Sequence, residues 1–294
     1  MAGKPQTKPP KWLNLLSDPR VSQAMGRLVR LRAPKPVLQA AITAFCKIYS
    51  VDLTEAERSL ADFATFQEFF TRRLKADARP VEPGLGVLPS PADGVLSIAG
   101  SLATDTLIQA KGIDYTLDAL LGGKEDADPY RGGSYAVVYL APNNYHRVHS
   151  PWQGEIVKWR YIAGPLYPVN RLGIQHVPGL FARNERIIGH CHTEFGPAAL
   201  IMVGATCVGH MRVCFSDLCT NEGKATTDLN TLTPPVSQSR GDEFGVFEMG
   251  STVVLVFANP DVEALVPVPS PVLQGQGVLR VSATASSSEP RHGA

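Results

Sequence analysis

Met249-Gly250-Ser251-Thr252 leads directly into Val253-Val254-Leu255-Val256-Phe257, a run of five apolar residues. A run of this kind, entered through a turn-forming Gly-Ser pair, predicts a buried strand. The pair also carries a chemical possibility, because the Ser251 hydroxyl can attack the Gly250 carbonyl, convert the peptide bond to an ester and cut the chain by elimination. Glycine suits that position since it places no Cβ beside the attacked carbonyl and accepts strained dihedral angles. An ordinary turn into a strand is the competing interpretation.

Short apolar segments bounded by Gly, Pro, Asn and Asp recur from about residue 86 onward. This spacing is typical of strands joined by turns, and the 26 glycines and 24 prolines favour such strands over a helical bundle. With 294 residues and 44% hydrophobic composition, the chain can bury a substantial core. We therefore expect an α+β fold with N-terminal helices packed on a largely antiparallel β core. Helices are predicted at about 20–32, 36–50 and 65–74, with a short one near 117–121, and strands at 94–99, 135–140, 154–162, 186–190, 198–203, 207–213, 245–247 and 252–257.

The N-terminal region differs from the rest of the chain in charge. Residues 1–35 carry eight Lys or Arg and one Asp, so the net charge of +1 conceals a basic start and an acidic remainder. No window reaches the roughly 18 uninterrupted apolar residues of a membrane span, and the start lacks the pattern of a signal peptide. Two interpretations stay open: basic amphipathic helices lying in a membrane interface, or helices packed on the protein's own core. The apolar residues at helical spacing are Val21, Ala24, Met25, Leu28 and Val29, then Val37, Ala41, Ala44, Phe45 and Ile48.

Three chemistry-bearing residues lie far apart in the sequence: Asp93, His149 and Ser251. Carboxylate, imidazole and hydroxyl form the set in which a base held by an acid activates a serine. A plainer role for Asp93 is as a turn residue, since Ala-Asp-Gly before alternating apolar residues is a strong turn signal. In an ideal strand His146 and His149 lie on opposite faces, so both can reach one site only if the backbone bends between them.

Seven separate blocks occur in one order between about residues 51 and 260. They are PADGV (91–95), QAKG-x-DY (109–115), YHRVH (145–149), LFARNER (180–186), EFGP (194–197), VGAT-x-VG (203–209) and GST (250–252). In order and spacing the chain resembles the bacterial phosphatidylserine decarboxylase proenzymes. The resemblance implies a membrane-associated lyase that converts phosphatidylserine to phosphatidylethanolamine through a pyruvoyl cofactor, which derives from Ser251 and forms a Schiff base with the substrate.

The resemblance also assigns roles to residues. Asp93, His149 and Ser251 match the charge-relay positions for self-cleavage between Gly250 and Ser251. We hypothesise that His149, paired with Asp93, deprotonates Ser251, and that His146 then donates a proton in decarboxylation. A hydrogen-bonded structural histidine is the alternative for His146.

The organisation that follows has two regions and two fragments. Residues 1–50 form a basic, amphipathic, membrane-associating region, and residues 51–294 form the catalytic domain with a disordered tail over 284–294. Cleavage gives a beta chain, 1–250, and an alpha chain, 251–294, which stay paired as a heterodimer. We expect a peripheral protein on the cytoplasmic side of the cell membrane, with phosphatidylserine as substrate and neither a metal nor a nucleic acid as partner.

Two positions depart from the family pattern. Met249 stands where the family commonly has leucine, a volume-conserving change that should leave cleavage intact. Asn144 stands where an acid usually precedes YHRVH, which removes a charge near the histidines. Three arginines are candidates for the substrate's phosphate or carboxylate, although each such residue is more often a surface or structural ion-pair partner: Arg147, Arg183 and Arg186.

Three other classes of protein are weighed against this interpretation. A serine hydrolase would keep Ser251 as a hydroxyl, but no G-x-S-x-G motif surrounds it. A metal site could use His190 and His192 with His146 or His149, yet no H-E-x-x-H motif is present. A non-enzymatic membrane-binding module would leave the C-terminal blocks unexplained. The five cysteines include no C-x-x-C pair, which indicates reduced, buried thiols.

Overall fold

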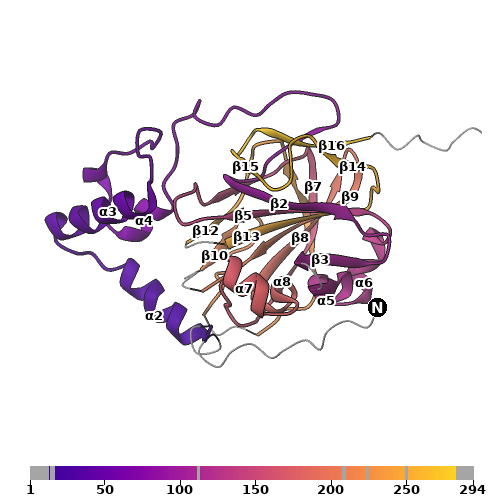
Figure 1. Ribbon diagram of the computed structural model, residues 1–294, viewed down its shortest axis with the longest axis horizontal. Helices are drawn as coiled ribbons and strands as arrows, with labels where there is room; N and C mark the ends of the chain where they lie inside the picture. The colour runs from indigo at the N-terminus through magenta and orange to yellow at the C-terminus, as the bar shows by residue number, and fades with distance from the viewer. Residues whose placement is uncertain are drawn as a thin grey trace, which may run out of the picture.

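The computed structural model describes residue 13 and residues 17–110, 113–206, 210–222, 225–248 and 251–282. The fold is α+β, as predicted, and its centre is a sheet of eight strands in which every neighbouring pair is antiparallel (Figure 1). In spatial order these strands are β11 (Asn230–Gln238), β7 (Gly154–Ile162), β8 (Arg186–Thr193), β9 (Gly196–Val203), β13 (Ser251–Phe257), β5 (Ser134–Leu140), β2 (Gly94–Ser101) and β15 (Ser270–Val272).

Strand β13 lies inside this sheet, paired with β9 on one side and β5 on the other. Residues 252–256 are fully buried, so neither face of the strand meets water. Burial on both faces explains why this segment is a continuous apolar run and not an alternation of apolar and polar residues. The strand predicted from that run is confirmed.

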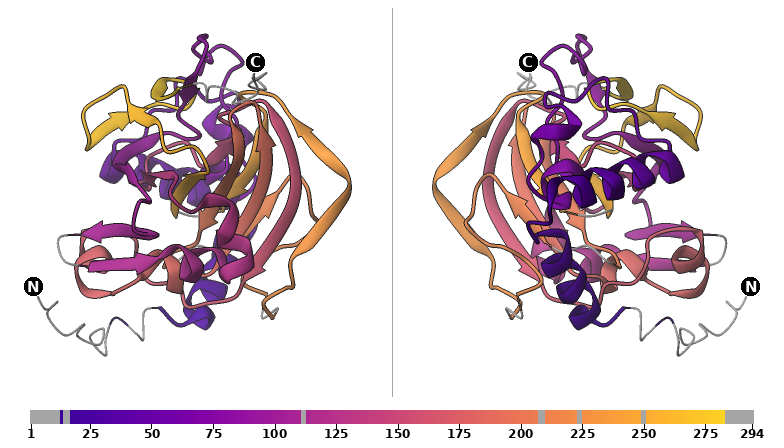
Figure 2. Two further views of the ribbon diagram at one scale, coloured as in Figure 1. Left: turned by 90° about the vertical axis from the view of Figure 1, so that its right-hand side faces the viewer. Right: turned by 90° about the vertical axis from the view of Figure 1, so that its left-hand side faces the viewer.

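Smaller elements surround the central sheet. One three-stranded sheet has the order β10 (Met211–Val213), β12 (Glu243–Phe247), β6 (Arg147–His149), and another the order β1 (Val87–Pro89), β16 (Gly277–Val281), β14 (Val262–Ala264). Strands β3 (Thr106–Ala110) and β4 (Ile113–Thr116) pair with each other. The short helices α5 (Leu117–Leu121), α6 (Lys124–Ala127), α7 (Arg171–His176) and α8 (Leu180–Arg183) lie on the same side of the molecule (Figure 2).

The observed elements depart from the predictions in several places, three of which have a clear physical cause or lie at the limit of the described residues. Strand β11 was not expected, because Pro234 and Pro235 interrupt it; it occurs at the sheet edge, where missing backbone donors are tolerated. The helix predicted at 65–74 is only α4 (Phe66–Phe70), since Leu74 leaves the helix to pair with Ala56. Of the strand predicted at 207–213, Met211–Val213 forms β10, and residues 207–209 lie outside the described residues.

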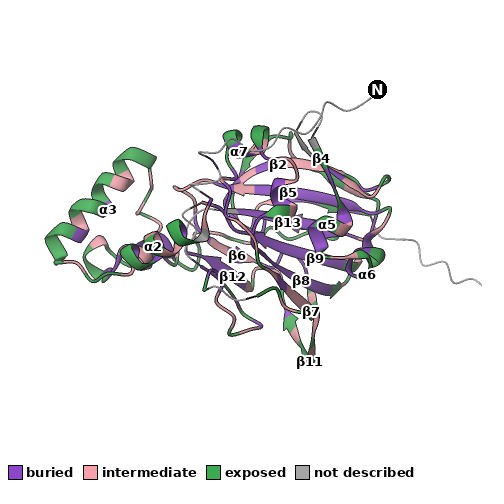
Figure 3. Ribbon diagram, turned by 90° about the horizontal axis from the view of Figure 1, so that it is seen from below, coloured by how far each residue is buried: buried purple, intermediate pink, exposed green. Residues whose placement is uncertain are grey.

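The N-terminal helices project to one side of the sheet (Figures 1 and 3). Helix α2 (Pro19–Val29) begins at Asp18, whose side chain accepts a hydrogen bond from the Arg20 amide, and α3 (Lys35–Tyr49) ends at Ser50 in the left-handed conformation. One face of α3 packs on α4 and forms a small core separate from that of the sheet. The buried members of this core are Leu38, Ile42, Phe63, Phe69 and Phe70.

Two isoleucines on α3 provide a direct test of this packing. Ile42 is fully buried, whereas Ile48 is 74% exposed. We expect Ile42→Ala to lower the free energy of unfolding by about 2–4 kcal/mol, because it removes buried methylene groups and leaves a cavity. Ile48→Ala should change it by less than about 0.5 kcal/mol. Urea unfolding followed by circular dichroism measures both, and equal effects would contradict the packing described.

Candidate active site

The backbone pairing brings distant parts of the sequence to one end of the central sheet. Ser251 pairs with Leu140 on β5, and on the other side of β5 strand β2 begins at Gly94, next to the pair Val95 and Tyr139. Two strand spacings separate β13 from β2, about 10 Å. Asp93, directly before Gly94, therefore lies at the same end of the sheet as Ser251.

The Gly-Ser junction connects the small sheet to the central one. At the end of β12 the Phe247 amide donates to the His146 carbonyl (3.0 Å), and the next amide, of Glu248, donates to the His210 carbonyl (2.9 Å). Met249 and Gly250 lie outside the described residues, and only the backbone of Ser251 is described. His146 is thus nearer to the junction along the strands than His149, which pairs with Glu243 at the opposite end of β12.

The Asp93 carboxylate is buried and bound by a guanidinium. Arg79 donates from Nε to Oδ1 and from Nη2 to Oδ2, both at 2.8 Å, and the Gln274 amide donates to Oδ1 at 2.9 Å. Such a two-pronged pair is among the stronger ionic contacts in proteins. Arg79 also binds Glu55 through two hydrogen bonds. Asp93 is therefore anchored as a carboxylate inside the loop that precedes β2.

His149 lies beside Asp93 but does not hydrogen-bond to it. Its Nδ1 donates to the Gly241 carbonyl (2.7 Å), its Nε2 accepts from the Tyr145 hydroxyl (3.1 Å), and its amide donates to the Pro91 carbonyl. Burial lowers the pKa of His149, although the Gly241 hydrogen bond opposes this. The imidazole is therefore neutral at pH 7, with Nε2 the basic nitrogen. His149 and Tyr145 line a cavity of about 350 Å³.

His146 is completely buried against Phe70, with ring centroids 4.1 Å apart. Its Nδ1 donates to the Asn144 carbonyl (2.8 Å), while its Nε2 has no hydrogen-bond partner among the described residues. Burial lowers the pKa of His146 to about 3, and the nearby Arg72 cation acts in the same direction. An unmatched buried nitrogen is costly, which makes it a candidate for contact with a ligand. The Asn144 side chain closes the preceding turn by accepting from the Ala141 amide (2.7 Å).

The three arginines singled out from the sequence have different surroundings. Arg186 is 2% exposed and donates to the carbonyls of Leu120, Asn184 and Ala119 at 2.7–2.9 Å, so its role is structural. Burial lowers the pKa of this guanidinium to about 10. Arg183 lies over the Tyr167 ring. Arg147, between the two histidines, lies on β6 beside β12 and is paired with Glu243.

Two partnerships at this site could not be read from the sequence. Arg79 has no motif around it that marks it as the partner of Asp93. The second is the pairing of Arg30, at the end of α2, with the buried carboxylate of Glu248 at 2.5 Å. Burial tends to raise the pKa of Glu248, but hydrogen bonds from His210 and Arg30 outweigh it and lower the pKa. The helix predicted to lie at a membrane is therefore tied to the residue two before Gly250.

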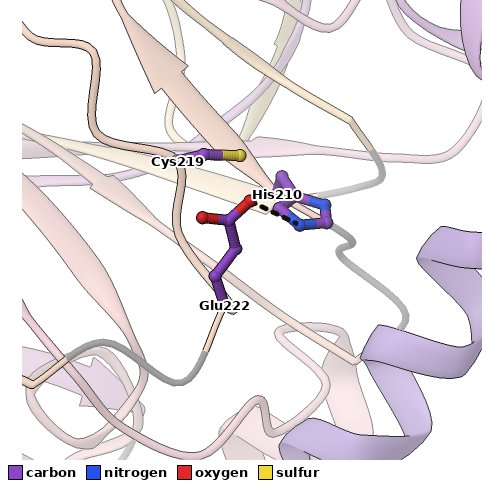
Figure 4. A group of neighbouring side chains, drawn as sticks. All are labelled: His210, Cys219 and Glu222. Carbon is purple, nitrogen blue, oxygen red and sulfur yellow. Dashed lines mark ion pairs between the residues drawn. The ribbon is translucent and has the colours of Figure 1, made fainter.

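One group among the described residues has ligand atoms close enough to share an ion: His210, Cys219 and Glu222, within 4.8 Å of one another (Figure 4). Arg30 Nη2 lies 2.5 Å from His210 Nδ1, which places a fixed positive charge against this group. The rival metal site weighed above, of His190 and His192 with His146 or His149, does not come together among the described residues. His190 is buried with its Nδ1 on the Tyr130 hydroxyl (2.8 Å), and His192 is exposed.

Known proteins similar to this chain are decarboxylases made as proenzymes. Residues 66–280 match the model of the family described as phosphatidylserine decarboxylase, and the chain belongs to that family. The phosphatidylserine decarboxylase proenzyme of Anaeromyxobacter sp. (strain K) is 45% identical over 249 residues, 83% of this chain and 87% of that protein. Those of Myxococcus xanthus and Klebsiella pneumoniae subsp. pneumoniae are 41% and 42% identical, covering 84% and 87% of this chain and 88% and 79% of those proteins.

Buried neutral histidines predict a specific dependence of stability on pH. Burial lowers the pKa of His190 to about 4 and that of His146 to about 3, whereas in the unfolded chain a histidine titrates near 6.5. Below about pH 6.5 the unfolded chain binds protons that the folded chain does not, so stability falls as pH falls. The expected slope is about 1.4 kcal/mol per pH unit for each histidine.

Urea unfolding of the Ser251→Ala chain between pH 6.5 and 4.5 measures this slope. Adding His190→Gln should reduce the slope by about 1.4 kcal/mol per unit. The matched control is His192→Gln, on the same strand and exposed to solvent, which should leave it unchanged. Identical slopes in all three proteins would show that His190 is not buried in its neutral form.

Proposed function

We propose that this chain cuts itself between Gly250 and Ser251 and then decarboxylates phosphatidylserine to phosphatidylethanolamine, using a pyruvoyl group derived from Ser251. The observation that carries the proposal is the family match over residues 66–280, which includes the junction and both histidines. The backbone arrangement supports it, because Asp93, His146 and Ser251 come from different strands or loops and lie around one end of the sheet.

Self-cleavage first requires a base that accepts the proton of the Ser251 hydroxyl. His149 is suited to this task, since its Nδ1 proton is held by Gly241, which leaves Nε2 as the basic nitrogen once the Tyr145 hydroxyl gives way to that of Ser251. The Asp93 carboxylate is too firmly held by Arg79 to move, so it favours a positive charge on His149 from a fixed position. Val253 and the rest of β13 anchor the residue after the cut.

The surroundings of Ser251 fit a pyruvoyl group. Thr252 Oγ1 and His146 Nε2 are buried polar atoms without a hydrogen-bond partner among the described residues, so each can serve a group that the precursor does not contain. A pyruvoyl group supplies a carbonyl that condenses with the substrate amine and accepts the electron pair left when carbon dioxide departs. The substrate ammonium must lose a proton before it can react, and Nε2 of His146 can accept that proton. His146 can then return it to the carbon that lost carbon dioxide.

The N-terminal helices present an apolar, basic face to solvent. On the outer face of α2 and α3, Leu28 is 59% exposed and Ile48 74% exposed, and Figure 3 shows the outside of α3 as exposed. Arg27, Arg32 and Lys47 are exposed beside them. Among the described residues no helix is both long enough and apolar enough to cross a bilayer. We infer that these helices lie in the membrane interface, where the substrate headgroup is found.

Intact mass under denaturing conditions tests self-cleavage. Wild-type protein should give two fragments, 1–250 and 251–294, the second without a free amine, and Ser251→Ala should give one intact chain. Borohydride reduction in the presence of an amine substrate should add its mass to the smaller fragment alone. An uncut wild-type chain that decarboxylates phosphatidylserine at full rate would overturn the proposal.

The two histidines should separate the two reactions. We expect His149→Ala to slow cleavage by about 10²–10⁴-fold, the usual contribution of a general base. His146→Ala should cleave normally and lose decarboxylation by a similar factor. The cleaved fraction on a denaturing gel and the release of carbon dioxide measure these effects, and continued turnover in His146→Ala would make His146 a structural residue.

Membrane contact can be tested on a single helix. Ile48→Asp should weaken binding to vesicles of phosphatidylcholine and phosphatidylglycerol by at least about 10-fold, since a buried isoleucine contributes about 1.5–3 kcal/mol. Thr43→Asp makes the same charge change on another exposed side of α3 and should bind almost as well as wild type. Co-sedimentation measures both, and equal binding by Ile48→Asp and wild type would exclude this face.

A further inference from the structure

Five arginines line a cavity of about 320 Å³ between α4 and the small sheet β10-β12-β6. Four of them have a carboxylate partner: Arg58 pairs with Glu68, Arg73 and Arg147 with Glu243, and Arg212 with Glu248. The fifth, Arg72, has no carboxylate within 4 Å in the part of the chain that the structure describes.

Arg72 is also the most completely buried of these arginines, at 6% exposure. Among the described residues its side chain makes one hydrogen bond, a long contact from Nη2 to the Asn143 carbonyl (3.4 Å), and its buried Nε has no partner there. The Phe69 ring lies 5.6 Å from the guanidinium carbon. A guanidinium stays charged in proteins, and burying an unpaired charge is costly. The Arg72 side chain is therefore suited to bind an anionic group of a ligand.

Arg72 lies close to the proposed reaction site. The Asn143 carbonyl that it contacts belongs to the turn between Leu140, the partner of Ser251, and His146. Phe70, two residues before Arg72, packs on the His146 ring. An anion on Arg72 would therefore lie beside the place where the substrate amine must react.

A phosphatidylserine headgroup carries two anions, a carboxylate and a phosphodiester. The carboxylate loses its charge as carbon dioxide leaves, so a cation bound to it would stabilise the substrate more than the transition state. The phosphodiester keeps its charge throughout, and its oxygens suit the planar fork of a guanidinium. Binding it positions the headgroup without opposing decarboxylation.

We propose that Arg72 is a substrate-positioning residue that holds the phosphodiester of the phosphatidylserine headgroup in the arginine-lined cavity. This inference rests on the proposed function. In this proposal the enzyme recognises the phosphodiester next to the serine through Arg72, which lies outside the YHRVH motif of residues 145–149.

Reductive trapping with cyanoborohydride on two amines tests the proposal. Glycerophosphoserine has the phosphodiester, amine and carboxylate, whereas O-methylserine has only the last two. In Arg72→Gln the second-order trapping rate for glycerophosphoserine should fall about 10–100-fold, the usual loss when a charged hydrogen bond is removed. The rate for O-methylserine should stay within about twofold. Arg72→Lys, which keeps a point charge, should recover part of the loss for glycerophosphoserine.

Matched variants separate positioning from folding. Arg72→Gln should cleave itself and keep the wild-type melting temperature or exceed it, because it removes an unpaired buried charge. Arg186→Gln is the contrasting buried arginine and should melt lower, since three main-chain carbonyls lose their donor. A melting temperature that falls equally in both variants would make Arg72 structural and overturn the proposal.

The remaining outcomes are equally decisive. Equal losses for both amines, a loss for O-methylserine alone, or no loss at all would each exclude phosphodiester binding by Arg72. A wild-type protein that traps neither amine would instead refute the proposed function itself, so the two failures are distinguishable.

Discussion

The backbone hydrogen bonds that hold β13 between β5 and β9 fix the Gly-Ser junction at one end of the sheet. All seven residues of β13 pair with β5, six pair with β9, and residues 252–256 are fully buried. A chain cut before Ser251 would keep this strand, because neither ladder crosses the cut. Under the proposed cleavage, the same pairing would hold the 44-residue fragment, 251–294, on the rest of the protein.

Burial sets the chemistry around that junction. His146 and His149 are neutral because the protein interior disfavours their charged forms. The buried Asp93 carboxylate is bound by Arg79 through two hydrogen bonds, whereas Arg72 has no carboxylate partner in the part of the chain that the structure describes. Buried polar atoms without a partner occur at several places among the described residues, and two of them, His146 Nε2 and Arg72 Nε, belong to side chains that pack on neighbouring residues of α4. Natural proteins keep such costs where a ligand offsets them.

Local sequence was sufficient for six of the eight strands of the central sheet: β2, β5, β7, β8, β9 and β13. The bounds of β7 agree with the prediction at 154–162, and α5 with that near 117–121, because apolar spacing and turn residues act over short distances. Prediction failed at β11, where Pro234 and Pro235 argue against a strand unless its position at the sheet edge is known. It also failed at α4, which ends early because Leu74 pairs with the distant Ala56.

The sequence by itself determined the fold class, the family blocks and the identity of the Gly-Ser junction, since these depend on local pattern and on residue order. Which side chains meet was decided only by the tertiary structure. Arg79 binds Asp93, Gly241 holds His149, and Arg30 reaches Glu248 across 218 positions of sequence. Each of these contacts forms only when separate elements pack together. The spacing of residues along the chain does not indicate which partner a buried polar group will contact.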